Sequence, residues 1–577
     1  MSSNKRSDND KSSQPVLNPA ADRVTHMKWW GWGVEGVAFE HRDKPSFAPF
    51  VKKHIGLDLN KKSHNGIDFS SLDVPATNAP KSFLQSVAGI VGGDNCVTSD
   101  LDRVVHAYGK SVRDLLRIRS NDLGRIPDVV VYPADENEVR QLMDLVVAND
   151  AVLIPFGGGS NIAGSLESNR DEARSVVSLD MGRMNKVLSI DDESRIAQVQ
   201  AGALGPDLEK QLNDRGWTLG HFPDSFNHST LGGWIATRSS GMQSDKYGDI
   251  ADLTRALRVV MPNGSLHTRP VPSQSTGPSV REMLIGSEGR LGVITEATVH
   301  VHRIPKNRVI LAYLFKSFDD GLRAMAEIAE SDASPSITRV SDASETAFSF
   351  ATTKKQGFKS KAKSKVQQFA LTRIKGFDMS KACLSFIGYE GSEAHVEYQK
   401  DIVNEIVSKH GGLCAGPGPG VLYDQKKFDT PYIRDFLLDH DAIADVSETA
   451  APWSRLSIVH HNAYQAVNNA MKEVGVRGYI MSHLSHSYHG GACLYFTFAI
   501  VAPDPATRLE KYDAVKQAIQ QSFIDSGATL SHHHGVGVEH KQWLPEDISP
   551  AGVDLMQTLF DGVDPKGNLN PGKITGR

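Results

Sequence analysis

The stretch AVLIPFGGGSN, residues 151–161, joins a short apolar run to three consecutive glycines. The run has the length of a buried strand and passes into the glycines without a polar turn. Consecutive glycines cost backbone entropy, but they let main-chain N–H groups turn toward one anion, as in a phosphate-binding nest. No Gly-Lys-Ser or Gly-Lys-Thr follows, which excludes a nucleotide-hydrolysing P-loop. By itself, the segment is either an anion site or a plain glycine loop.

Short strands alternate with helices on both sides of this loop. Apolar residues recur at helical spacing after Pro133, and strict apolar–polar alternation marks a half-buried strand before Pro305. Beyond Pro305 the pattern resets, as expected at a domain boundary. The predicted strands lie at 129–132, 151–154, 176–179, 196–199, 293–304, 309–314 and 384–389, and the predicted helices at 136–149, 206–216 and 506–526.

The composition is that of a folded soluble protein, with 40% hydrophobic and 23% charged residues and a net charge of −5 over 577 residues. The slight acidity predicts no nucleic-acid partner, and the lack of an 18-residue apolar run argues against a transmembrane helix. Four widely spaced cysteines exclude a disulfide framework and fit a reducing compartment. The first residues lack the apolar core of a signal peptide, and Thr575-Gly576-Arg577 is no peroxisomal tripeptide. We therefore expect a cytoplasmic location.

The early segment MKWWGWGVEG contains a G-x-G-x-x-G pattern at Gly31, Gly33 and Gly36. A dinucleotide fingerprint needs a strand before the glycines and a helix after them. Here a polar tail precedes the pattern and no helical period follows. We interpret the segment as tryptophan-rich packing rather than a Rossmann site.

Three more segments follow the glycine loop: HFPDSFNHSTLGGW at 221–234, TRSSGMQSDKYG at 237–248 and GSEGRLGVITEA at 286–297. In order and spacing, the four segments resemble the FAD domain of the vanillyl-alcohol oxidase/PCMH flavoproteins. The resemblance implies that the glycine loop holds the pyrophosphate of FAD while the other segments line the flavin and close over it. The implied cofactor-binding residues are Pro155, Phe156, Gly157, Gly158, Gly159, Ser160, Asn161, Asp224, Ser225, Phe226, Asn227, His228, Ser229, Thr230, Thr237, Arg238, Ser239, Ser240, Glu288, Gly289, Arg290, Leu291, Gly292, Val293 and Ile294.

Two positions depart from the flavoprotein pattern. Many relatives attach the flavin through a His beside the glycine loop, where this chain has Pro155 and Phe156. We therefore predict non-covalent FAD. Arg290 stands where the family usually has Thr, which puts one flavin contact in doubt.

The second half carries PYIRD (431–435), SETAAPWSR (447–455), GACLYFTF (491–498) and SHHHGVG (531–537). With the early MKWWGWG, these resemble the alkylglycerone-phosphate synthase family of ether-lipid enzymes. The resemblance implies exchange of the acyl group of acyl-dihydroxyacetone phosphate for a fatty alcohol. It implies a substrate adduct at the flavin N5 and no net oxidation.

The resemblance assigns catalytic roles to Tyr495 and to the triplet His532, His533 and His534. On an extended backbone, His532 and His534 face one way and His533 the other. Imidazoles suit proton transfer near neutral pH, although a structural cluster or a metal site is also open. We expect no metal, because no carboxylate or Cys lies nearby in the sequence. Tyr495 is either a buried core residue or a phenol whose pKa nearby cations lower for acid–base work.

Two arginines are candidate substrate ligands. The family counterpart of Arg434, in YIRD, binds the anionic group of the substrate, and the planar guanidinium fork suits phosphate or carboxylate. A surface ion pair is the alternative. Arg339 matches another arginine needed for activity, although the residues alone show only an Arg at the end of a strand-like segment.

The stretch HLSHSYHGG departs from the family. The peroxisomal enzymes have an Arg where His483 stands, so a permanent charge is lost there. His483, His486 and His489 form either a metal site or a differently shaped substrate pocket. This departure is compatible with a member of a related group that acts on a different substrate.

The predicted fold class is α+β, a PCMH-type two-subdomain FAD-binding domain with an α+β cap of FAD-linked oxidase C-terminal type. The predicted divisions are a disordered tail (1–26), a mostly helical segment (27–122), the FAD-binding domain (123–305), the cap (306–535) and a C-terminal segment packing back on the FAD domain (536–577). A homodimer is expected by resemblance. Six lysines in 354–365 form either a solvated loop or a contact with an anionic membrane surface.

Besides the ether-lipid synthase, two functions share such a flavin domain: an FAD-linked dehydrogenase or oxidase of a D-2-hydroxy acid, and a flavin-binding scaffold without catalysis. YIRD and SHHHGVG favour the synthase.

Overall fold

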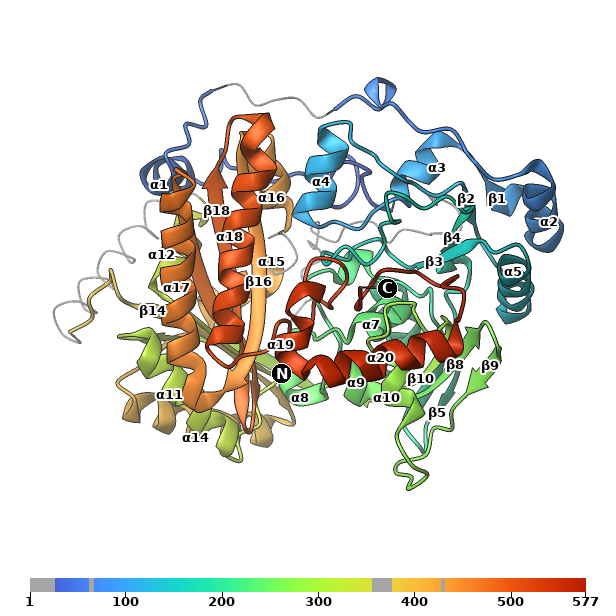
Figure 1. Cartoon of the computed structure of the whole chain (residues 1–577). Helices are drawn as coiled ribbons and strands as arrows, with labels where there is room; N and C mark the ends of the chain where they lie inside the picture. The colour runs from blue at the N-terminus through green and yellow to red at the C-terminus, as the bar shows by residue number, and fades with distance from the viewer. Residues whose placement is uncertain (1–25, 62–66, 355–375, 427–430, 577) are drawn as a thin grey trace.

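The computed structural model describes residues 26–61, 67–354, 376–426 and 431–576. These form two halves that lie side by side, the predicted FAD-binding domain and the cap (Figure 1). The predicted tail (1–26), except His26, and the lysine cluster (354–365), except Lys354, lie outside the described residues.

The first subdomain is a four-stranded sheet around the apolar run that precedes the glycines. Its strand order is β1-β2-β4-β3, and β2 and β3 both run parallel to β4. Strands buried on both faces need continuous apolar residues, which explains the VVV and VLI runs. The elements are β1 Cys96–Val97, β2 Val129–Val131, α5 Glu136–Ala148, β3 Val152–Phe156, β4 Val176–Asp180 and the 3₁₀ helix η3 Met181–Arg183. Strand β3 runs directly into Gly157.

The second subdomain is a five-stranded antiparallel sheet of order β5-β6-β10-β8-β9. The predicted strand 293–304 is two strands, because β10 ends at His300 and β11 pairs separately with β7. The strands are β5 Val187–Asp191, β6 Ile196–Gln200, β7 Trp217–Thr218, β8 Thr254–Met261, β9 Gly264–His267, β10 Val293–His300 and β11 His302–Arg303. The helices are α6 Gly205–Asn213, η4 Phe226–His228, α7 Leu231–Thr237, α8 Ser244–Tyr247, α9 Ile250–Leu253 and α10 Val280–Leu284.

The cap is built on a seven-stranded sheet of order β15-β12-β14-β13-β17-β18-β16, in which every adjacent pair is antiparallel. The strands are β12 Asn307–Phe315, β13 Ile337–Ser341, β14 Cys383–Gly391, β15 Leu413–Gly416, β16 Ala442–Pro452, β17 Gly478–Tyr488 and β18 Gly491–Val501. The helices are α11 Phe318–Glu330, α12 Ala343–Ala351, α14 Glu393–Lys409, α15 Pro417–Lys426, α16 Pro431–Leu438, η5 Trp453–Arg455, α17 Leu456–Glu473 and α18 Pro505–Asp525.

The two faces of the cap sheet have different roles. Helices α17 and α18 lie over one face (Figure 1), where Leu494, Phe496 and Phe498 of β18 join the main core. Successive strand residues point to opposite faces, so Tyr495 and Thr497 point away from that core. The sequence alternation of β18 therefore separates a packing face from a face that is free for chemistry.

The N-terminal segment covers the cap and the first subdomain. Its tryptophan-rich start contains neither helix nor strand over residues 26–46, in agreement with a packing role. A Cβ on Gly33 would lie 2.2 Å from the hydroxyl of Tyr432, so the glycine permits this close approach to α16. The helices of the segment are α1 Phe47–Ile55, η1 Phe69–Ser71, α2 Lys81–Val91, η2 Gly93–Asn95, α3 Asp100–Val105 and α4 Val112–Arg119.

The C-terminal segment returns to the first subdomain. Its helix α20 runs along the FAD-binding half of the molecule (Figure 1). Leu153 of β3 donates its N–H to the carbonyl of Asn568 (2.7 Å) and accepts from the N–H of Asn570 (3.0 Å). The side chain of Asn570 donates to the carbonyls of Ser165 and Glu288, both at 2.8 Å. The chain end thus ties together loops on either side of the glycines. The helices here are η6 Lys541–Trp543, α19 Leu544–Ile548 and α20 Pro550–Val563.

None of the helices in the described ranges combines the length and apolar character that a membrane span requires.

We expect Asn570→Ala to lower both thermal stability and FAD affinity, because it leaves two buried carbonyls without their donor at a cost of about 1–3 kcal/mol. FAD affinity should fall about tenfold or more, measured by quenching of flavin fluorescence. Asn568→Ala is the matched control, since Asn568 donates to Asp150 and Ala151 and does not line the large cavity. It should lower the melting temperature alone. Equal flavin affinity in both variants would contradict the assignment.

Candidate active site

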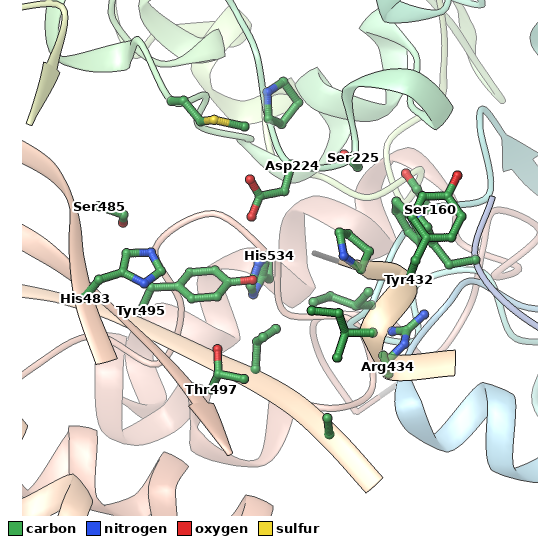
Figure 2. A pocket seen from close by; sticks show the side chains of 18 of the residues that line it. Ser160, Asp224, Ser225, Tyr432, Arg434, His483, Ser485, Tyr495, Thr497 and His534 are labelled. Carbon is green, nitrogen blue, oxygen red and sulfur yellow. The ribbon is translucent and has the colours of Figure 1, made fainter. Parts of the chain in front are cut away.

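A cavity of about 2140 Å³ lies between the two halves. Ordinary small-molecule pockets measure about 300–1,000 Å³, so this one has room for two large ligands. Its lining comes from the glycine loop, the cap sheet and the N-terminal segment. Figure 2 shows Asp224 on the FAD-domain side, opposite His483 and Tyr495 of the cap.

The glycine loop forms a cradle in which a side chain would not fit. A Cβ on Gly158 would lie 1.9 Å from the carbonyl oxygen of His228. Gly159 has φ of +68°, and its Cβ would lie 2.6 Å from the ring of Phe156. Ser240, which also lines the cavity, has a buried hydroxyl without a hydrogen-bond partner. This arrangement fits the pyrophosphate and ring of FAD, with backbone N–H groups as the donors.

Most residues predicted to bind the cofactor line this cavity. These are Pro155, Phe156, Gly157, Gly158, Gly159, Ser160, Asn161, Asp224, Ser225, Ser229, Thr230, Thr237, Ser239, Ser240, Glu288, Gly289, Gly292, Val293 and Ile294. The predicted residues that do not line it are Phe226, Asn227, His228, Arg238, Arg290 and Leu291. The motif therefore mixes residues that face the cavity with residues that shape the loops behind it.

Arg290 belongs to this second kind, and Glu288, which lines the cavity, also shapes the loops behind it. The guanidinium carbon of Arg290 lies 4.8 Å from the ring centre of Phe560, so the side chain packs on α20 rather than in the cavity. The carboxylate of Glu288 accepts from the hydroxyl of Ser165 (2.6 Å) and from the backbone N–H of Val536 (2.7 Å). It thereby joins the FAD-binding half to the loop that follows the His triplet.

Tyr495 lies on the cavity face of β18, stacked on His483 with ring centres 5.0 Å apart. The expectation of a lowered phenol pKa is wrong. Burial raises the pKa of Tyr495 well above its usual value, and the nearby carboxylates of Asp224 and Glu448 raise it further. The phenol therefore keeps its proton at neutral pH and can serve as a hydrogen-bond donor or general acid.

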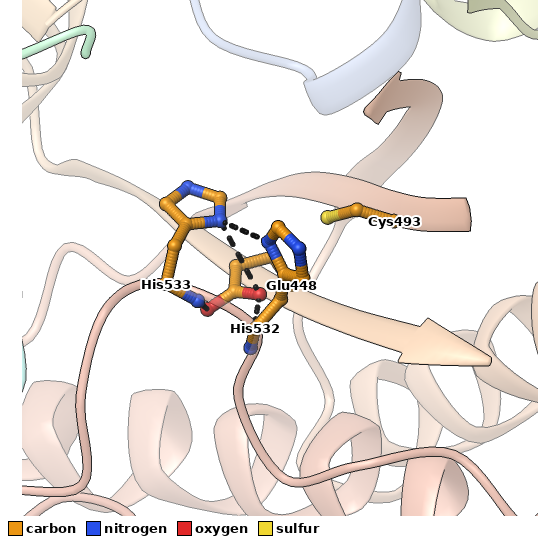
Figure 3. Close-up of side chains that lie close together, drawn as sticks. All are labelled: Glu448, Cys493, His532 and His533. Carbon is orange, nitrogen blue, oxygen red and sulfur yellow. Dashed lines mark hydrogen bonds and ion pairs between the residues drawn. The ribbon is translucent and has the colours of Figure 1, made fainter. Parts of the chain in front are cut away.

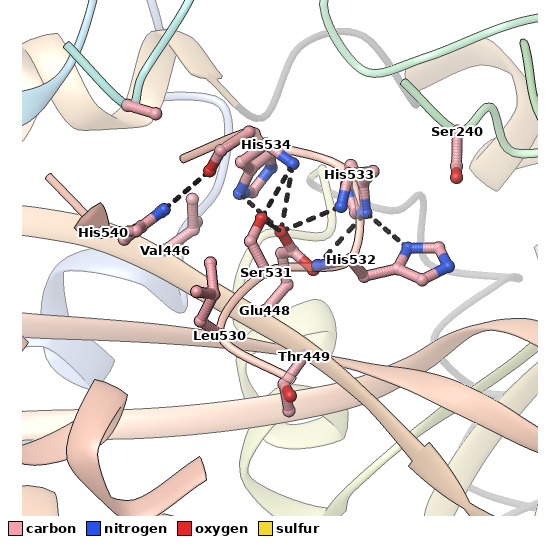
Figure 4. Close-up of polar contacts among 12 residues, drawn as sticks. Ser240, Val446, Glu448, Thr449, Leu530, Ser531, His532, His533, His534 and His540 are labelled. Atoms are coloured by element: carbon pink, nitrogen blue, oxygen red, sulfur yellow. Dashed lines mark hydrogen bonds and ion pairs between the residues drawn. The ribbon is translucent and has the colours of Figure 1, made fainter. Parts of the chain in front are cut away.

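The His triplet does not adopt the predicted alternation. Glu448 of β16 accepts from three consecutive backbone N–H groups, of His532 (2.6 Å), His533 (3.1 Å) and His534 (3.1 Å), as Figure 4 shows. Ser531 also donates its hydroxyl to this carboxylate at 2.7 Å. N–H groups that converge on one carboxylate require a bent backbone, whereas a strand would point them apart. As a result His533 and His534 both line the cavity, and His532 turns away.

The imidazoles of His533 and His534 carry no charge at neutral pH. Burial lowers the pKa of His533 to about 3 and that of His534 to about 4, although Glu448 acts in the opposite direction. The pKa of Glu448 is held far below its usual range by the three histidines, which outweigh its burial. This buried carboxylate also accepts three backbone N–H groups.

The structure overturns the reason given for expecting no metal. Glu448, Cys493, His532 and His533 bring one potential ligand atom each within 4.8 Å of one another (Figure 3). Glu448 and Cys493 are far from the triplet in the sequence, so the sequence did not show that they are its neighbours. The same atoms are engaged in hydrogen bonds, however, since Nδ1 of His532 and Nδ1 of His533 are 2.9 Å apart. A metal ion would have to replace that network.

Arg339, Glu345 and His483 form a buried group at the cavity wall. Nη2 of Arg339 lies 2.8 Å from Glu345 and 3.1 Å from Nδ1 of His483, which in turn lies 2.9 Å from Glu345. Arg339 therefore keeps a permanent positive charge beside the position where the resemblance places an Arg and this chain has His483. Burial and Arg339 lower the pKa of His483, so this ring is neutral at pH 7.

Arg434 points into the cavity from α16 (Figure 2). Its Nη1 donates to the carbonyl of Lys110 at 2.6 Å, but its Nε and Nη2 are buried without a partner. A buried guanidinium with free donors is costly unless an anion receives them. The surface ion pair considered from the sequence is not formed.

Sequence reasoning missed several residues. Glu448 lies in the quoted SETAAPWSR segment, but nothing local relates it to the triplet 84 positions away. Asn570 sits in NPGK at the chain end, and His486 and Ser485 line the cavity from β17. The pairing of β16, β17 and β18 brings Glu448, Ser485 and His486 together, whereas contacts of the chain end with β3 place Asn570.

Two family models match the chain: an FAD binding domain over residues 127–269, and the C-terminal domain of FAD linked oxidases over residues 304–574. The solved structure of p-cresol methylhydroxylase with substrate bound has the same fold, with a TM-score of 0.63 and 15% identity over 86% of this chain and 96% of that one. The fold and the cradle thus define an FAD-dependent flavoprotein of the PCMH type.

The nearer relatives narrow this class. An alkyldihydroxyacetonephosphate synthase of Dictyostelium discoideum is 37% identical over 96% of this chain and 94% of its own length. A solved alkyldihydroxyacetonephosphate synthase, 34% identical, covers 95% of this chain and 99% of its own, with a TM-score of 0.83. This chain belongs to the alkyldihydroxyacetonephosphate synthase (alkylglycerone-phosphate synthase) family, as its motifs predicted.

The Arg339–Glu345–His483 group predicts a pH-dependent stability. Burial would raise the pKa of Glu345, but His483 and Arg339 lower it to about 2, from an ordinary value of 4.5. A carboxylate with a depressed folded-state pKa stabilises above its unfolded pKa, and this contribution is lost as the pH falls from about 4.5 toward 2. Glu345→Gln should lower the melting temperature by a few degrees at pH 7, and the difference from wild type should shrink between about pH 5 and 3.

Glu397→Gln is the control for this experiment, because Glu397 is exposed and pairs only with Lys400. It should leave the melting temperature nearly unchanged throughout. A difference between wild type and Glu345→Gln that grows on acidification would contradict the pairing.

Proposed function

We propose that the protein exchanges the acyl group of an acyl-dihydroxyacetone phosphate for a fatty alcohol and so forms an ether-lipid precursor. The observation that carries this proposal is a single cavity that joins a cofactor cradle, an unpaired guanidinium and a long apolar branch. A dehydrogenase of a small hydroxy acid has no use for that branch.

The apolar branch is walled by the N-terminal segment and the cap. Phe50 of α1 contacts Phe348 of α12 and Tyr479 of β17, with ring centres 5.9 and 5.4 Å apart. Phe47 and Val51 belong to the same cluster, and all these residues line the cavity. Each methylene of an acyl or alkyl chain buried there would contribute about 0.8 kcal/mol to binding. This favours long-chain substrates.

The polar end of the cavity supplies an anion site. Arg434 offers its unpaired Nε and Nη2, a geometry that suits bidentate contact with a phosphate. Arg339, fixed by Glu345, adds a second guanidinium at the wall formed by β13. We assign Arg434 to the substrate phosphate and Arg339 to the positioning of the head group.

The reaction breaks the bond between substrate carbon and carboxylate oxygen and forms a bond from that carbon to the alcohol oxygen. The alcohol loses one proton, and no electron acceptor is consumed. FAD, which Gly157, Gly158 and Gly159 would hold, would supply the nucleophilic chemistry for this exchange. Tyr495 keeps its proton and can donate a hydrogen bond to the departing carboxylate, which leaves as the anion, and the neutral His533 and His534 can receive the proton of the alcohol.

Three finer features belong to the same proposal. We propose that FAD is held without a covalent bond, since Pro155 and Phe156 occupy the approach to the glycine loop. A homodimer and a peripheral membrane contact are proposed from the family resemblance, and a cytoplasmic location from the sequence.

The test follows flavin absorbance and products without oxygen. Palmitoyl-dihydroxyacetone phosphate with hexadecanol should give free palmitate and the alkyl ether in equal amounts, with no electron acceptor added. Acid precipitation of the same sample should release the yellow colour from the pellet. Turnover of D-2-hydroxy acids that needs an electron acceptor, without ether formation, would instead establish a dehydrogenase.

Arg434→Ala should raise the KM for the acyl phosphate about 10- to 100-fold, because a charge-assisted contact contributes about 1.5–3 kcal/mol. Arg434→Lys should give an intermediate KM, since it keeps the charge and loses the fork. Flavin content, read from the absorbance ratio of flavin to protein, controls for loss of the cofactor. An unchanged KM and kcat in Arg434→Ala would rule out this anion site.

A further inference from the structure

A chain of hydrogen bonds runs from the FAD-binding half to the cavity. Tyr488, the last residue of β17, donates its hydroxyl to Oδ2 of Asp249 at 2.8 Å. The same hydroxyl lies 2.6 Å from Nε2 of His532, and Nδ1 of His532 lies 2.9 Å from Nδ1 of His533. Asp249 precedes α9 in the FAD-binding domain, so the chain crosses from one half of the molecule to the other.

The carboxylate of Asp249, at one end of this chain, determines the direction of the hydrogen bonds along it. A carboxylate only accepts, so the hydroxyl of Tyr488 gives its proton to Asp249 and its oxygen is left to accept. Nε2 of His532 must then carry the proton. The two Nδ1 atoms face each other at 2.9 Å, so only one of them can carry a proton, and we assign it to His533, which leaves Nδ1 of His532 bare as the acceptor. Nε2 of His533 is left with a lone pair.

Glu448 supports the same assignment independently. Its Oε2 lies 3.7 Å from Nδ1 of His533, a position that favours a proton on this nitrogen. Burial lowers the pKa of His533, so the ring carries a single proton. The charged and titratable groups around the ring are Glu448, Asp249, His221, His486, Tyr495, His532 and His534, and of the two carboxylates Glu448 lies beside Nδ1.

We propose that Asp249 and Tyr488 are positioning residues that fix the tautomer of the His532–His533 pair, so that Nε2 of His533 faces the cavity as a proton acceptor. There it receives the proton of the incoming alcohol while the alcohol oxygen bonds to the substrate carbon, whose bond to the carboxylate oxygen is broken in the same exchange. This step rests on the proposed function, whereas the tautomer itself does not. Because Asp249 and Tyr488 belong to different halves, the acceptor is set only when the cap and the FAD-binding domain are assembled.

Tyr488→Phe tests the proposal. Without the hydroxyl, Nε2–H of His532 loses its acceptor, and the pair can shift its protons so that Nε2 of His533 carries hydrogen. An imidazole in the wrong tautomer cannot act as a base, and general-base catalysis contributes about 10²–10⁴-fold. Since Glu448 remains, we expect kcat to fall about 10- to 100-fold, with the KM for the acyl phosphate within about twofold and the flavin content unchanged.

Tyr464→Phe is the matched control. Tyr464 also donates its hydroxyl to a buried aspartate, Asp342, within the cap, but it does not line the cavity or touch the triplet. It should lower stability as Tyr488→Phe does and leave kcat near that of wild type. Equal losses of kcat in both variants would mean that Tyr488 has only a structural role.

Asp249→Ala and the double variant test whether Asp249 and Tyr488 act through one hydrogen-bond chain or affect kcat independently. Residues that act through one path are not additive, so Asp249→Ala with Tyr488→Phe should be no slower than the worse single variant. A loss of kcat in the double variant equal to the product of the two single losses would overturn the proposal.

A second readout does not depend on turnover. In wild-type holoenzyme labelled with ¹⁵N-histidine, the His533 signal, identified by its loss in His533→Ala, should show a protonated Nδ1 and a bare Nε2. Tyr488→Phe should shift it toward the other tautomer. A protonated Nε2 in wild type would overturn the proposal even if the ether forms. Absence of ether product with the predicted tautomer present would overturn the proposed function alone.

Discussion

The buried carboxylate of Glu448 holds the active-site side of the cap together. It accepts three backbone N–H groups and a hydroxyl, and hydrogen bonds to a charged group contribute about 1.5–3 kcal/mol each. Through these bonds one residue of β16 determines where the loop after α18 lies. The bend that it imposes presents His533 and His534 together, a geometry that an extended HHH sequence cannot produce.

The sheet that carries Glu448 also explains why chemistry and packing do not interfere. On β18, the residues between Leu494 and Phe498 alternate between a core under α17 and α18 and a wall of the cavity. Polar groups such as Tyr495 can therefore be placed precisely without opening the core. The opposite wall comes from the FAD-binding domain, and the hydrogen bonds of Tyr488 to Asp249 and of Tyr247 to Glu390 (2.7 Å) join the two. The two walls of the cavity are thus joined by side-chain hydrogen bonds.

At position 483, where the resemblance places an arginine, this chain has a histidine beside a buried arginine. His483 is neutral, but it is packed between Tyr495 and the Arg339–Glu345 pair, so a permanent positive charge stays within about 3 Å of the site. A metal at His483, His486 and His489 is not favoured by this geometry, since the potential metal-binding group found among the described residues is a different one, around Glu448. The cavity wall at this position thus keeps the guanidinium of Arg339.

The sequence by itself determined the fold class, the cofactor and the family. These conclusions rest on local patterns: the strand before the glycines, the order of the flavin segments, and YIRD with SHHHGVG. Such patterns can be recognised in the sequence because they depend only on the spacing of residues along the chain. It also placed Tyr495, Arg434 and most cavity residues of the flavin motifs. The tertiary structure alone decided the ionisation and the directions of the side chains. The raised pKa of Tyr495, the bend around Glu448 and the link from Asp249 through Tyr488 to His533 all depend on groups that are distant in sequence. Burial and long-range hydrogen bonds set proton positions, and neither is encoded in the spacing of neighbouring residues.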